Sequence, residues 1–382
     1  MTDTLFEGMD RPGHALGRFL LDSGTLTCDW APAFAAVPRH LFLPDLFWAY
    51  DMATGTSVAV NKATDPAGWL AAAESDIPIV TQWDDGDHQG EQPGSVSTSS
   101  ASMPSVVAAM LADLDVEPGM RVYEGGTGTG WNAALLAHRL GDTNVVTGEV
   151  DDAVAAAAKH RLKAAGLNPV VHTGDALTGC PDEGPYDRTI VTFGLREMPF
   201  PLIAQTKPGG IVLAPWGTHY STDDALVRLT VAADGSASGP FLRPVAFMKA
   251  RSQRHIWVAP QDMPAAESTT DVPWIGHGQF DPYPFVLGLR LPTLTHAVQV
   301  HENGQTLWLY SLSGSSWASA TFRDGAPTVV RQAGPRRLWE EFEVSHHWWV
   351  ENGEPGLDRV GLTVDSDGQL AWLDDPANCW AI

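Results

Sequence analysis

Residues 124–130 read EGGTGTG and place four glycines and one carboxylate within seven positions. Glycine lets a backbone turn sharply and approach a ligand, because it has no Cβ in the way. The spacing across Gly126, Gly128 and Gly130 is G-x-G-x-G, and Trp131 follows directly. The dinucleotide fingerprint needs G-x-G-x-x-G, and a P-loop needs Lys and then Ser or Thr after its last glycine. The segment fits neither template, which excludes the two commonest phosphate-binding interpretations.

Three acidic residues end consecutive predicted strands around this glycine turn: Glu124, Glu149 and Asp175. A carboxylate at position 124 would repel a phosphate but can face an ammonium group. Glu149 can accept both hydroxyls of a ribose, and Asp175 can accept from an adenine amine. One acid at a strand end is often only a helix N-cap. Three together indicate a nucleoside site, and S-adenosylmethionine, which carries an amine and no phosphate, fits it.

The region from Pro104 to Gly217 alternates strand and helix patterns. Alternating units of this size predict an α/β fold with a parallel, doubly wound sheet. The glycines that close two of the helical patterns are typical C-terminal stops. The predicted strands cover 121–126, 144–150, 169–176, 186–194 and 207–217, and the predicted helices include 131–141 and 151–166.

The flanking regions have a different character. Residues 1–80 mix short helical patterns with loops, and the polar segment 84–102 predicts a long loop, a feature that is often functional. Beyond residue 218, alternating segments are separated by ADG, ENG and SDG, which predict β-hairpins, with one helix expected near 336–344. Nine of the 15 tryptophans follow residue 250, so we expect a β-rich or α+β extension there.

The composition narrows the class of partner and the compartment. A formal net charge of -23 repels nucleic acid and anionic membranes, so we expect neither as a partner. No apolar run is long enough for a membrane span, and the first twenty residues lack a basic segment followed by an apolar one, so we expect neither a membrane span nor a secretory signal. The three cysteines are far apart and odd in number, which favours a reducing cytoplasm.

Other catalytic constellations are missing from the sequence. No Ser-His-Asp set and no cluster with metal-ligand spacing stands out, so we expect no metal. The pair His346–His347 is followed by two tryptophans and lacks a Cys or acidic partner at ligand spacing. We therefore assign it to packing or to the surface.

Several motifs resemble those of protein-L-isoaspartate O-methyltransferases. They are RVYEGGTGTGWNAALLA, GEVDD, GDAL, GPYDRTIVTF and KPGGIVLAPWG, preceded by VPRHLFLPD and by IPIVTQ and STSSASMP. The resemblance covers roughly residues 15–250. It implies a Rossmann-like class I methyltransferase sheet, S-adenosylmethionine as the donor with S-adenosylhomocysteine as product, and an aspartyl-type side-chain carboxylate of a peptide as the acceptor.

The resemblance also implies roles for individual residues. Glu124 and Gly126 would contact the methionine end of the cofactor, Glu149 the ribose and Asp175 the adenine. Ser102 would serve the acceptor side, although it could equally be a plain helix N-cap, or do both. The other implied cofactor contacts are Ser99, Ser100, Thr127, Gly128, Gly130, Asn132, Val150 and Ala176.

The chain departs from the family in three ways. It continues beyond the methyltransferase region, its loop before Ser102 is long, and S-M-P-S-V stands where the family has an S-x-P-H-M type stretch. Long, tryptophan-rich relatives resemble methyltransferases of ribosomal peptide biosynthesis (graspetides and lanthipeptides). We therefore expect methylation of an Asp in such a precursor, which promotes aspartimide formation. Isoaspartate repair and a non-catalytic peptide-binding relative are the alternatives.

These expectations define three regions. Residues 1–103 form an N-terminal helical and substrate-loop region, 104–250 the Rossmann-like methyltransferase domain, and 251–382 a β-rich extension that recognises the peptide. The expected partner is a peptide substrate, and a monomer is favoured.

Overall fold

The computed structural model describes residues 14–255, 263–274, 278 and 280–382. Its contacts divide the chain into two compact units. The first comprises the chain up to Phe193 together with 199–213 and 230–235, and the second comprises 194–198, 214–229 and 236–382.

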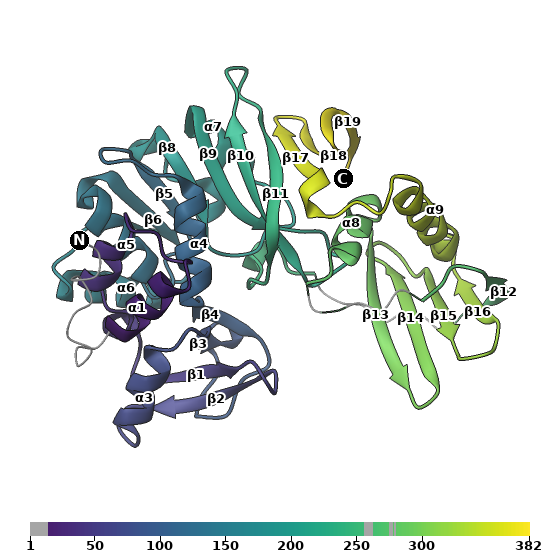
Figure 1. The fold of residues 1–382 in the computed structure, drawn as a ribbon, viewed down its shortest axis with the longest axis horizontal. Coiled ribbons are helices and arrows are strands. Elements are labelled where there is room, and N and C mark those ends of the chain that lie inside the picture. The colour runs from purple at the N-terminus through teal and green to yellow at the C-terminus, as the bar shows by residue number, and fades with distance from the viewer. Residues whose placement is uncertain (1–13, 256–262, 275–277, 279) are drawn as a thin grey trace. The chain divides into compact units, whose positions relative to one another are not determined.

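A parallel sheet forms the centre of the first unit (Figure 1), with neighbouring strands in the order β9-β8-β5-β6-β7. The β5–β6, β5–β8, β6–β7 and β8–β9 pairs are all parallel, which confirms the α/β expectation. The helix α4 contacts β8, while α5 and α6 contact β6. The strands are β5 (Val122–Gly125), β6 (Val145–Glu149), β7 (Val170–Thr173), β8 (Tyr186–Val191) and β9 (Thr206–Trp216, in this unit through Leu213), and the helices are α4 (Pro104–Leu114), α5 (Trp131–Leu140), α6 (Asp152–Ala164) and α7 (Phe200–Ala204).

Local sequence explains where these elements begin and end. All four residues of β5 are buried, as expected for a central parallel strand covered on both faces. The helix α5 ends at Gly141, whose N–H donates to the Ala137 carbonyl at a positive φ of 89°. The helix α6 begins after Asp151, whose carboxylate accepts from the N–H groups of Ala153 and Val154.

The N-terminal part of this unit contains a second sheet that the sequence did not predict. Its strand order is β2-β1-β3-β4, and all of its pairs are antiparallel. The segment 84–102, expected to be a loop throughout, ends in the strand β4, because its polar residues pair with β3. The elements are α1 (His14–Asp22), α2 (Ala31–Ala36), η1 (Arg39–Phe42), β1 (Leu46–Asp51), β2 (Thr56–Asn61), α3 (Pro66–Ala73), β3 (Ile79–Trp83), η2 (Asp84–Gly86) and β4 (Ser97–Ala101).

The second unit is rich in antiparallel strands, as expected. One group has the order β10-β11-β17-β18-β19, and a separate five-stranded sheet has the order β12-β16-β15-β14-β13. The turns ADG, ENG and SDG connect β10 to β11, β13 to β14 and β17 to β18, and each pair of strands is adjacent in its sheet, which confirms the three predicted hairpins. The strands are β10 (Asp224–Val231), β11 (Ala237–Val245), β12 (Ala266–Thr270), β13 (Leu294–His301), β14 (Gly304–Ser311), β15 (Trp317–Phe322), β16 (Thr328–Ala333), β17 (Val360–Asp365), β18 (Gly368–Leu373) and β19 (Asp375–Ala381).

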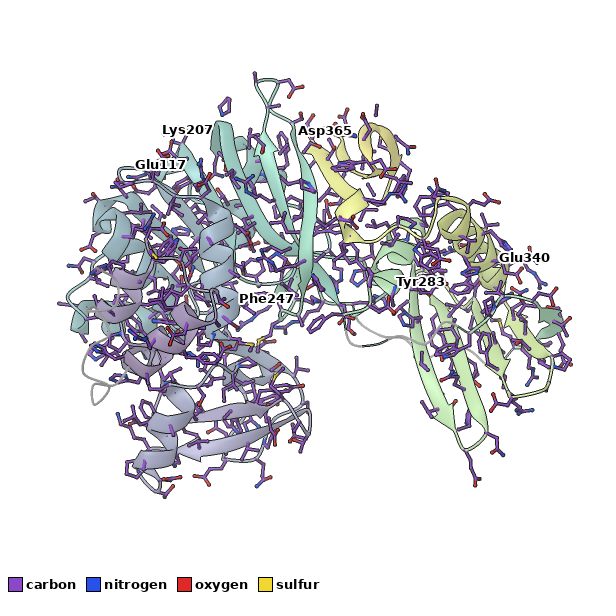
Figure 2. All side chains as sticks on the ribbon, viewed as in Figure 1. Glu117, Lys207, Phe247, Tyr283, Glu340 and Asp365 are labelled. Atoms are coloured by element: carbon purple, nitrogen blue, oxygen red, sulfur yellow. The ribbon has the colours of Figure 1, made fainter. Side chains whose placement is uncertain are left out.

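Two helices, α8 (Pro282–Arg290) and α9 (Leu338–Glu351), accompany the five-stranded sheet, and α9 confirms the predicted helix. Residues of α9 such as Trp339 and Phe342 form one apolar core with alternate residues of β14 and β15. Tyr283 of α8 is buried in this core, whereas Glu340 of α9 is exposed (Figure 2). No helix within the described ranges is long and apolar enough to cross a membrane.

Candidate functional site

The parallel strands of the first unit bring three of the predicted acids to one edge of the sheet. In register, Gly125 of β5 lies beside Gly148 of β6 and Val191 of β8, and Glu149 lies beside Thr173 of β7. The loops that follow β5, β6 and β7 therefore leave the sheet at its carboxyl edge. Open α/β sheets bind ligands at this edge.

The glycine turn between β5 and α5 is held tightly against β6. The N–H groups of Gly126 and Thr127 both donate to the Gly148 carbonyl, at 2.8 and 3.1 Å. Gly126 has a φ of +96°, and a Cβ there would lie 2.6 Å from Thr192 Oγ1. The Thr192 hydroxyl donates to the Gly126 carbonyl at 2.7 Å. Both backbone conformation and space thus require glycine at position 126.

Glu124 is fully buried at the end of β5, with 0 % of its surface exposed. Its carboxylate accepts from the Thr147 hydroxyl at 2.6 Å and from Asn132 Nδ2 at 2.7 Å. Thr147 Oγ1 also lies 2.7 Å from Thr127 Oγ1. Burial, and to a smaller extent the charge of Glu149, raise the pKa of Glu124 to about 7, although the hydrogen bonds from Thr147 and Asn132 act to lower it. Glu124 therefore titrates near neutral pH.

Glu149 joins the end of β6 to the glycine turn. One carboxylate oxygen accepts from the Gly128 N–H at 2.9 Å, and the other accepts from the Asp151 N–H at 3.1 Å. The next residue, Val150, is 47 % exposed. The structure thus places a half-buried carboxylate against the backbone of Gly128, which is where the ribose ligand was predicted.

Asp175 follows β7 and is exposed. Its carboxylate accepts from the Leu177 N–H at 3.0 Å and so caps the short helix η4 (Ala176–Thr178). Ala176 is buried, and its carbonyl accepts from the Tyr123 hydroxyl at 2.9 Å. Asp175 thus has a capping role in the structure, and its contact with adenine stays a prediction.

The strand β4 carries the serines expected beside the cofactor and passes close to the glycine turn. The Ser100 carbonyl lies 3.5 Å from the position that a Cβ on Gly128 would take. Ser99 and Ser100 pair with Gln82 and Val80 of β3. This arrangement brings β4 over the turn that follows β5.

Ser102 lies just beyond β4, in the connection to α4. The N-cap residue of α4 is Met103, whose side chain makes no capping hydrogen bond. The alternative role of Ser102 as a helix N-cap is therefore wrong, because the helix begins one residue later. The Asp76 carboxylate instead accepts from the Ser105 N–H at 2.8 Å.

Sequence reasoning missed two side chains that tie β3 and β4 to the sheet edge. Gln82 Nε2 donates to the Asp151 carboxylate at 3.0 Å, and Gln82 Oε1 accepts from the Thr98 hydroxyl at 2.9 Å. The second is Arg39, whose guanidinium donates to the carbonyls of Ile77, just before β3, and Ala101, at the end of β4. No pattern in a single sequence indicates the contact between Gln82 and Asp151. Arg39 did have a signal, because it lies in the motif VPRHLFLPD that resembles a family signature.

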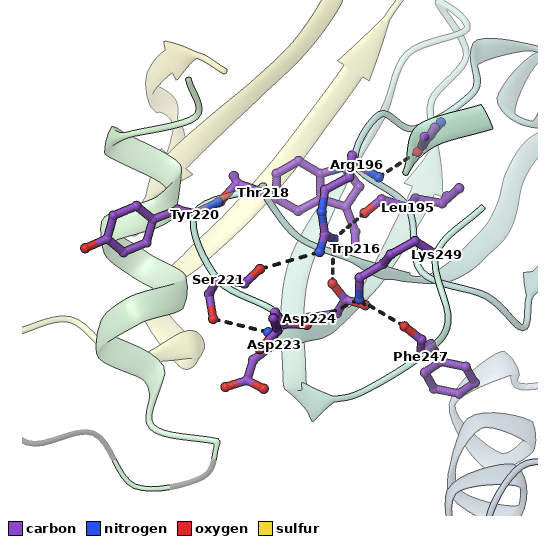
Figure 3. Close-up of polar contacts among 12 residues, drawn as sticks. Leu195, Arg196, Trp216, Thr218, Tyr220, Ser221, Asp223, Asp224, Phe247 and Lys249 are labelled. Atoms are coloured by element: carbon purple, nitrogen blue, oxygen red, sulfur yellow. Dashed lines mark hydrogen bonds and ion pairs between the residues drawn. The ribbon is translucent and has the colours of Figure 1, made fainter. Parts of the chain in front are cut away.

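A second cluster of charges lies in the second unit. The fully buried carboxylate of Asp224 bonds Arg196 Nη1 at 2.6 Å and Lys249 Nζ at 2.5 Å (Figure 3). Lys249 also donates to the Phe247 carbonyl at 3.0 Å. Burial lowers the pKa of Lys249, whereas the charge of Asp224 raises it. The cluster pairs its charges internally, so we assign it a structural role.

Of the paired histidines, His346 packs within the apolar part of the second unit, whereas His347 is exposed. His346 is buried, and its Nδ1 lies 2.8 Å from the Tyr283 hydroxyl. Burial lowers the pKa of His346. Across the described ranges, no group of three His, Cys, Asp or Glu side chains could hold a metal ion.

The residues at the sheet edge fit S-adenosylmethionine better than a phosphate ligand. The edge combines carboxylates, hydroxyls and glycine backbone, which suits an ammonium, a sulfonium and ribose hydroxyls. The sheet and this edge together have the arrangement of a class I methyltransferase fold.

The comparisons with known proteins agree. Residues 88–255 match the family model described as protein-L-isoaspartate(D-aspartate) O-methyltransferase. Over 162 residues the chain is 37% identical to the protein-L-isoaspartate O-methyltransferase of Thermococcus onnurineus (strain NA1), an alignment that covers 42% of this chain and 71% of the relative. The chain belongs to the protein-L-isoaspartate O-methyltransferase family.

Two further comparisons define the extent of the likeness. The relative from Pyrococcus horikoshii (strain ATCC 700860 / DSM 12428 / JCM 9974 / NBRC 100139 / OT-3) is 43% identical over 137 residues, which cover 35% of this chain and 61% of the relative. A solved structure titled protein-L-isoaspartate O-methyltransferase aligns with a TM-score of 0.55 at 21% identity, covering 98% of this chain and all of the other. That alignment supports the fold, including a counterpart of the C-terminal extension.

Proposed function

We propose that the protein transfers a methyl group from S-adenosylmethionine to the side-chain carboxylate of an aspartyl-type residue in a peptide. The products are a carboxyl methyl ester and S-adenosylhomocysteine. The observation that carries this proposal is the bond between Glu149 and the Gly128 N–H, at the sheet edge beside which Ser100 of β4 lies. Family membership supports the same reaction.

The reaction requires little general acid–base catalysis by the protein. S-adenosylmethionine, when bound, supplies an electrophilic methyl group on a sulfonium. The acceptor carboxylate is already an anion at neutral pH, because its ordinary pKa is near 4. A new O–C bond forms as the C–S bond breaks, and no proton moves. The tasks left to the protein are alignment of acceptor and donor and exclusion of water.

The proposed roles follow the sheet edge. Glu149 binds the ribose hydroxyls, Asp175 the adenine amine, and Glu124 with Gly126 the methionine end, while Ser102 contacts the acceptor. The remaining proposed cofactor contacts are Ser99, Ser100, Thr127, Gly128, Gly130, Asn132, Val150 and Ala176.

An isoaspartyl residue in a damaged protein is the acceptor we favour. The relatives from Pyrococcus horikoshii and Thermococcus onnurineus carry that acceptor in their names. The C-terminal extension does not argue against it, since a structure with the same title aligns over 98% of this chain. Repair would follow when the neighbouring backbone nitrogen attacks the ester carbonyl, methanol leaves, and water opens the resulting succinimide to give Asp in part of the product.

An ordinary Asp in a modified ribosomal precursor is the second candidate acceptor. The long segment before β4 and the S-M-P-S-V stretch, which lacks the family's histidine, favour it. After methylation, the neighbouring backbone nitrogen would attack the ester carbonyl and methanol would leave, giving an aspartimide. If the acceptor is an Asp of a ribosomal precursor, the C-terminal region 251–382 holds the precursor peptide.

Mass spectrometry of matched peptides distinguishes the two acceptors. We would incubate the protein and S-adenosylmethionine with one sequence made with Asp or with isoAsp, and with a cognate precursor where one is encoded nearby. Gain of a methyl group on the isoAsp peptide alone supports repair, whereas loss of one water from an Asp precursor supports tailoring. A non-catalytic relative would bind the cofactor and modify none of the peptides.

Ser102→Ala is expected to lower turnover more than cofactor affinity. If Ser102 contacts the acceptor, its loss removes a hydrogen bond worth about 1 kcal/mol, so kcat/KM for the peptide should fall roughly fivefold while the cofactor Kd stays the same. The matched control is Ser97→Ala, at the opposite end of β4. Equal effects of the two substitutions would show that Ser102 has no acceptor role.

Cofactor affinity is expected to rise with pH between about 5.5 and 7. Glu124, with a pKa raised to about 7, is mostly neutral at the lower pH and gains charge as pH rises. A bound ammonium would favour the charged form, and the ligand's own α-amine, with an ordinary pKa near 8, stays protonated in this range. Calorimetry at several pH values should show roughly tenfold tighter binding at the upper end.

The control for this pH dependence is Glu124→Gln, which cannot gain charge. Its cofactor affinity should be nearly flat over the same range. A wild-type affinity that does not change with pH would contradict direct charge pairing between Glu124 and the cofactor.

A further inference from the structure

Arg39 is almost completely buried, with 1 % of its surface exposed, in the first turn after Pro38. Its guanidinium donates to backbone carbonyls rather than forming a close ion pair with a carboxylate. Burial lowers the pKa of this group, and the charges of Asp76 and Glu74 raise it. Burying a cation is costly unless hydrogen bonds compensate, so the arrangement calls for an explanation.

Five backbone carbonyls accept from the Arg39 guanidinium, and they come from three segments of the first unit. Nη1 donates toward the carbonyls of Ala73 and Ser75, at 3.4 and 3.2 Å, at the end of α3 and in the turn that follows. Nη2 donates toward the Ile77 carbonyl at 2.9 Å, just before β3. The last two bonds go to the end of β4 and its continuation, namely the carbonyls of Ala101 at 2.9 Å and Ser102 at 3.0 Å.

The segment that contains Arg39 also contacts the start of α5. The Arg39 guanidinium carbon lies 5.7 Å from the centre of the Trp131 ring, within the range of a cation–π contact. Trp131 Nε1 donates to the Val37 carbonyl at 3.0 Å, and Phe34 packs edge-on against the ring at 5.5 Å. Trp131 directly follows Gly130, the last glycine of the turn.

We propose that Arg39 is a positioning residue that fixes the acceptor side of the site relative to the glycine turn. One guanidinium bonds the backbone of Ser102 and packs on Trp131, the residue that follows the turn. Methyl transfer requires the acceptor oxygen in line with the donor, and a misplacement of about 1 Å can cost roughly a hundredfold in rate. Arg39 thus acts on transfer through Ser102, without touching either reactant. This inference rests on the proposed function.

Arg39→Lys is the direct test, because lysine keeps the charge but lacks the planar fork that spans three segments. We expect kcat for the peptide to fall about 10- to 100-fold, while the cofactor Kd changes less than about threefold. The matched control is Arg139→Lys at the other end of α5. Arg139 also donates to a carbonyl, that of Val116, and stacks at 4.7 Å on an aromatic ring, that of Trp30.

The control variant should lose a comparable amount of stability and keep kcat near the wild-type value. A milder second variant is Asp76→Ala, which removes the bond to Ser105 and one of the charges that favour the Arg39 cation. We expect Asp76→Ala also to lower kcat for the peptide while the cofactor Kd stays nearly unchanged, with a smaller loss of kcat than in Arg39→Lys. An unchanged kcat in whichever of the two variants folds, or equal losses in Arg39→Lys and Arg139→Lys, would overturn the proposal.

Hydrogen exchange separates this proposal from the proposed function. In Arg39→Lys with S-adenosylhomocysteine present, amides of 97–105 should exchange faster, while those of 124–132 should be unaffected. Unchanged exchange in 97–105, or an equal increase in both segments, overturns the positioning role. If the wild-type protein methylates no peptide, the proposed function fails, and the exchange result still decides whether Arg39 positions Ser102.

Discussion

Replacing Glu149 with alanine is expected to weaken S-adenosylmethionine binding by about 100- to 10,000-fold. The substitution would remove the two charge-assisted hydrogen bonds between the carboxylate and the ribose, each worth roughly 1.5–3 kcal/mol. The same substitution removes the bonds that Glu149 accepts from the N–H groups of Gly128 and Asp151, so the glycine turn loses its tie to the end of β6. Isothermal calorimetry on the wild-type and variant proteins measures the effect directly.

Two controls make this result specific. Glu149→Gln keeps the shape and one oxygen acceptor, so it should bind the cofactor more tightly than the alanine variant and less tightly than the wild type. Glu117→Ala removes an exposed acid ahead of β5 (Figure 2) and should leave the affinity unchanged. Unchanged binding by Glu149→Ala would show that Glu149 only braces the turn.

The second large effect is expected in the second unit. Asp224→Asn would leave Arg196 and Lys249 facing a neutral amide in a site where the Asp224 side chain is fully buried. Breaking a buried ion pair from one side costs about 3–5 kcal/mol, because the remaining charge has no partner. Hydrogen exchange in increasing urea, followed on peptides from 214–250, measures the loss of stability where it arises.

Asp223→Asn is the matched control, one residue away. Burial and the charge of Asp224 raise the pKa of Asp223, so removing its charge should relieve repulsion. We expect that variant to be as stable as the wild type or slightly more so. Equal destabilisation by the two substitutions would contradict the structural role assigned to the Asp224 cluster.

The parallel sheet and its glycine turn could be predicted from sequence because their signals are local. Strand and helix patterns alternate from Pro104 onward, and β5, β6 and α5 end at or next to the glycine or acid that closes their patterns. The positive φ of Gly126, Gly128 and Gly130 is the physical reason for their spacing. The hairpins of the second unit were equally visible, since Asn-Gly and Asp-Gly favour tight turns.

The small antiparallel sheet could not be predicted, because its stability comes from pairing and packing rather than from local pattern. The segment that forms β4 reads STSSA and has no apolar alternation, yet it pairs with β3 from Ile79 to Trp83. The apolar core beneath it joins Phe47, Trp69 and Ile79 with Ala101. These residues are far apart in the chain, and no pattern in one sequence brings them together.

Long-range polar contacts were invisible for the same reason. The bonds from Arg39 to Ala101 and from Gln82 to Asp151 connect residues more than sixty positions apart. The N-cap assignment for Ser102 failed more locally, because the helix begins at Pro104 with Met103 as its cap. A shift of one residue in the start of a helix decides whether a serine hydroxyl caps the helix or can contact a ligand.

The central claim is that the protein forms carboxyl methyl esters on a peptide. Its most direct test uses S-adenosylmethionine with a labelled methyl group and matched Asp and isoAsp peptides, followed by mild base. Carboxyl methyl esters hydrolyse under those conditions, so the account predicts labelled methanol that depends on the peptide and is strongly reduced in Glu149→Ala. Tight cofactor binding with no base-labile label on any of these peptides would contradict it.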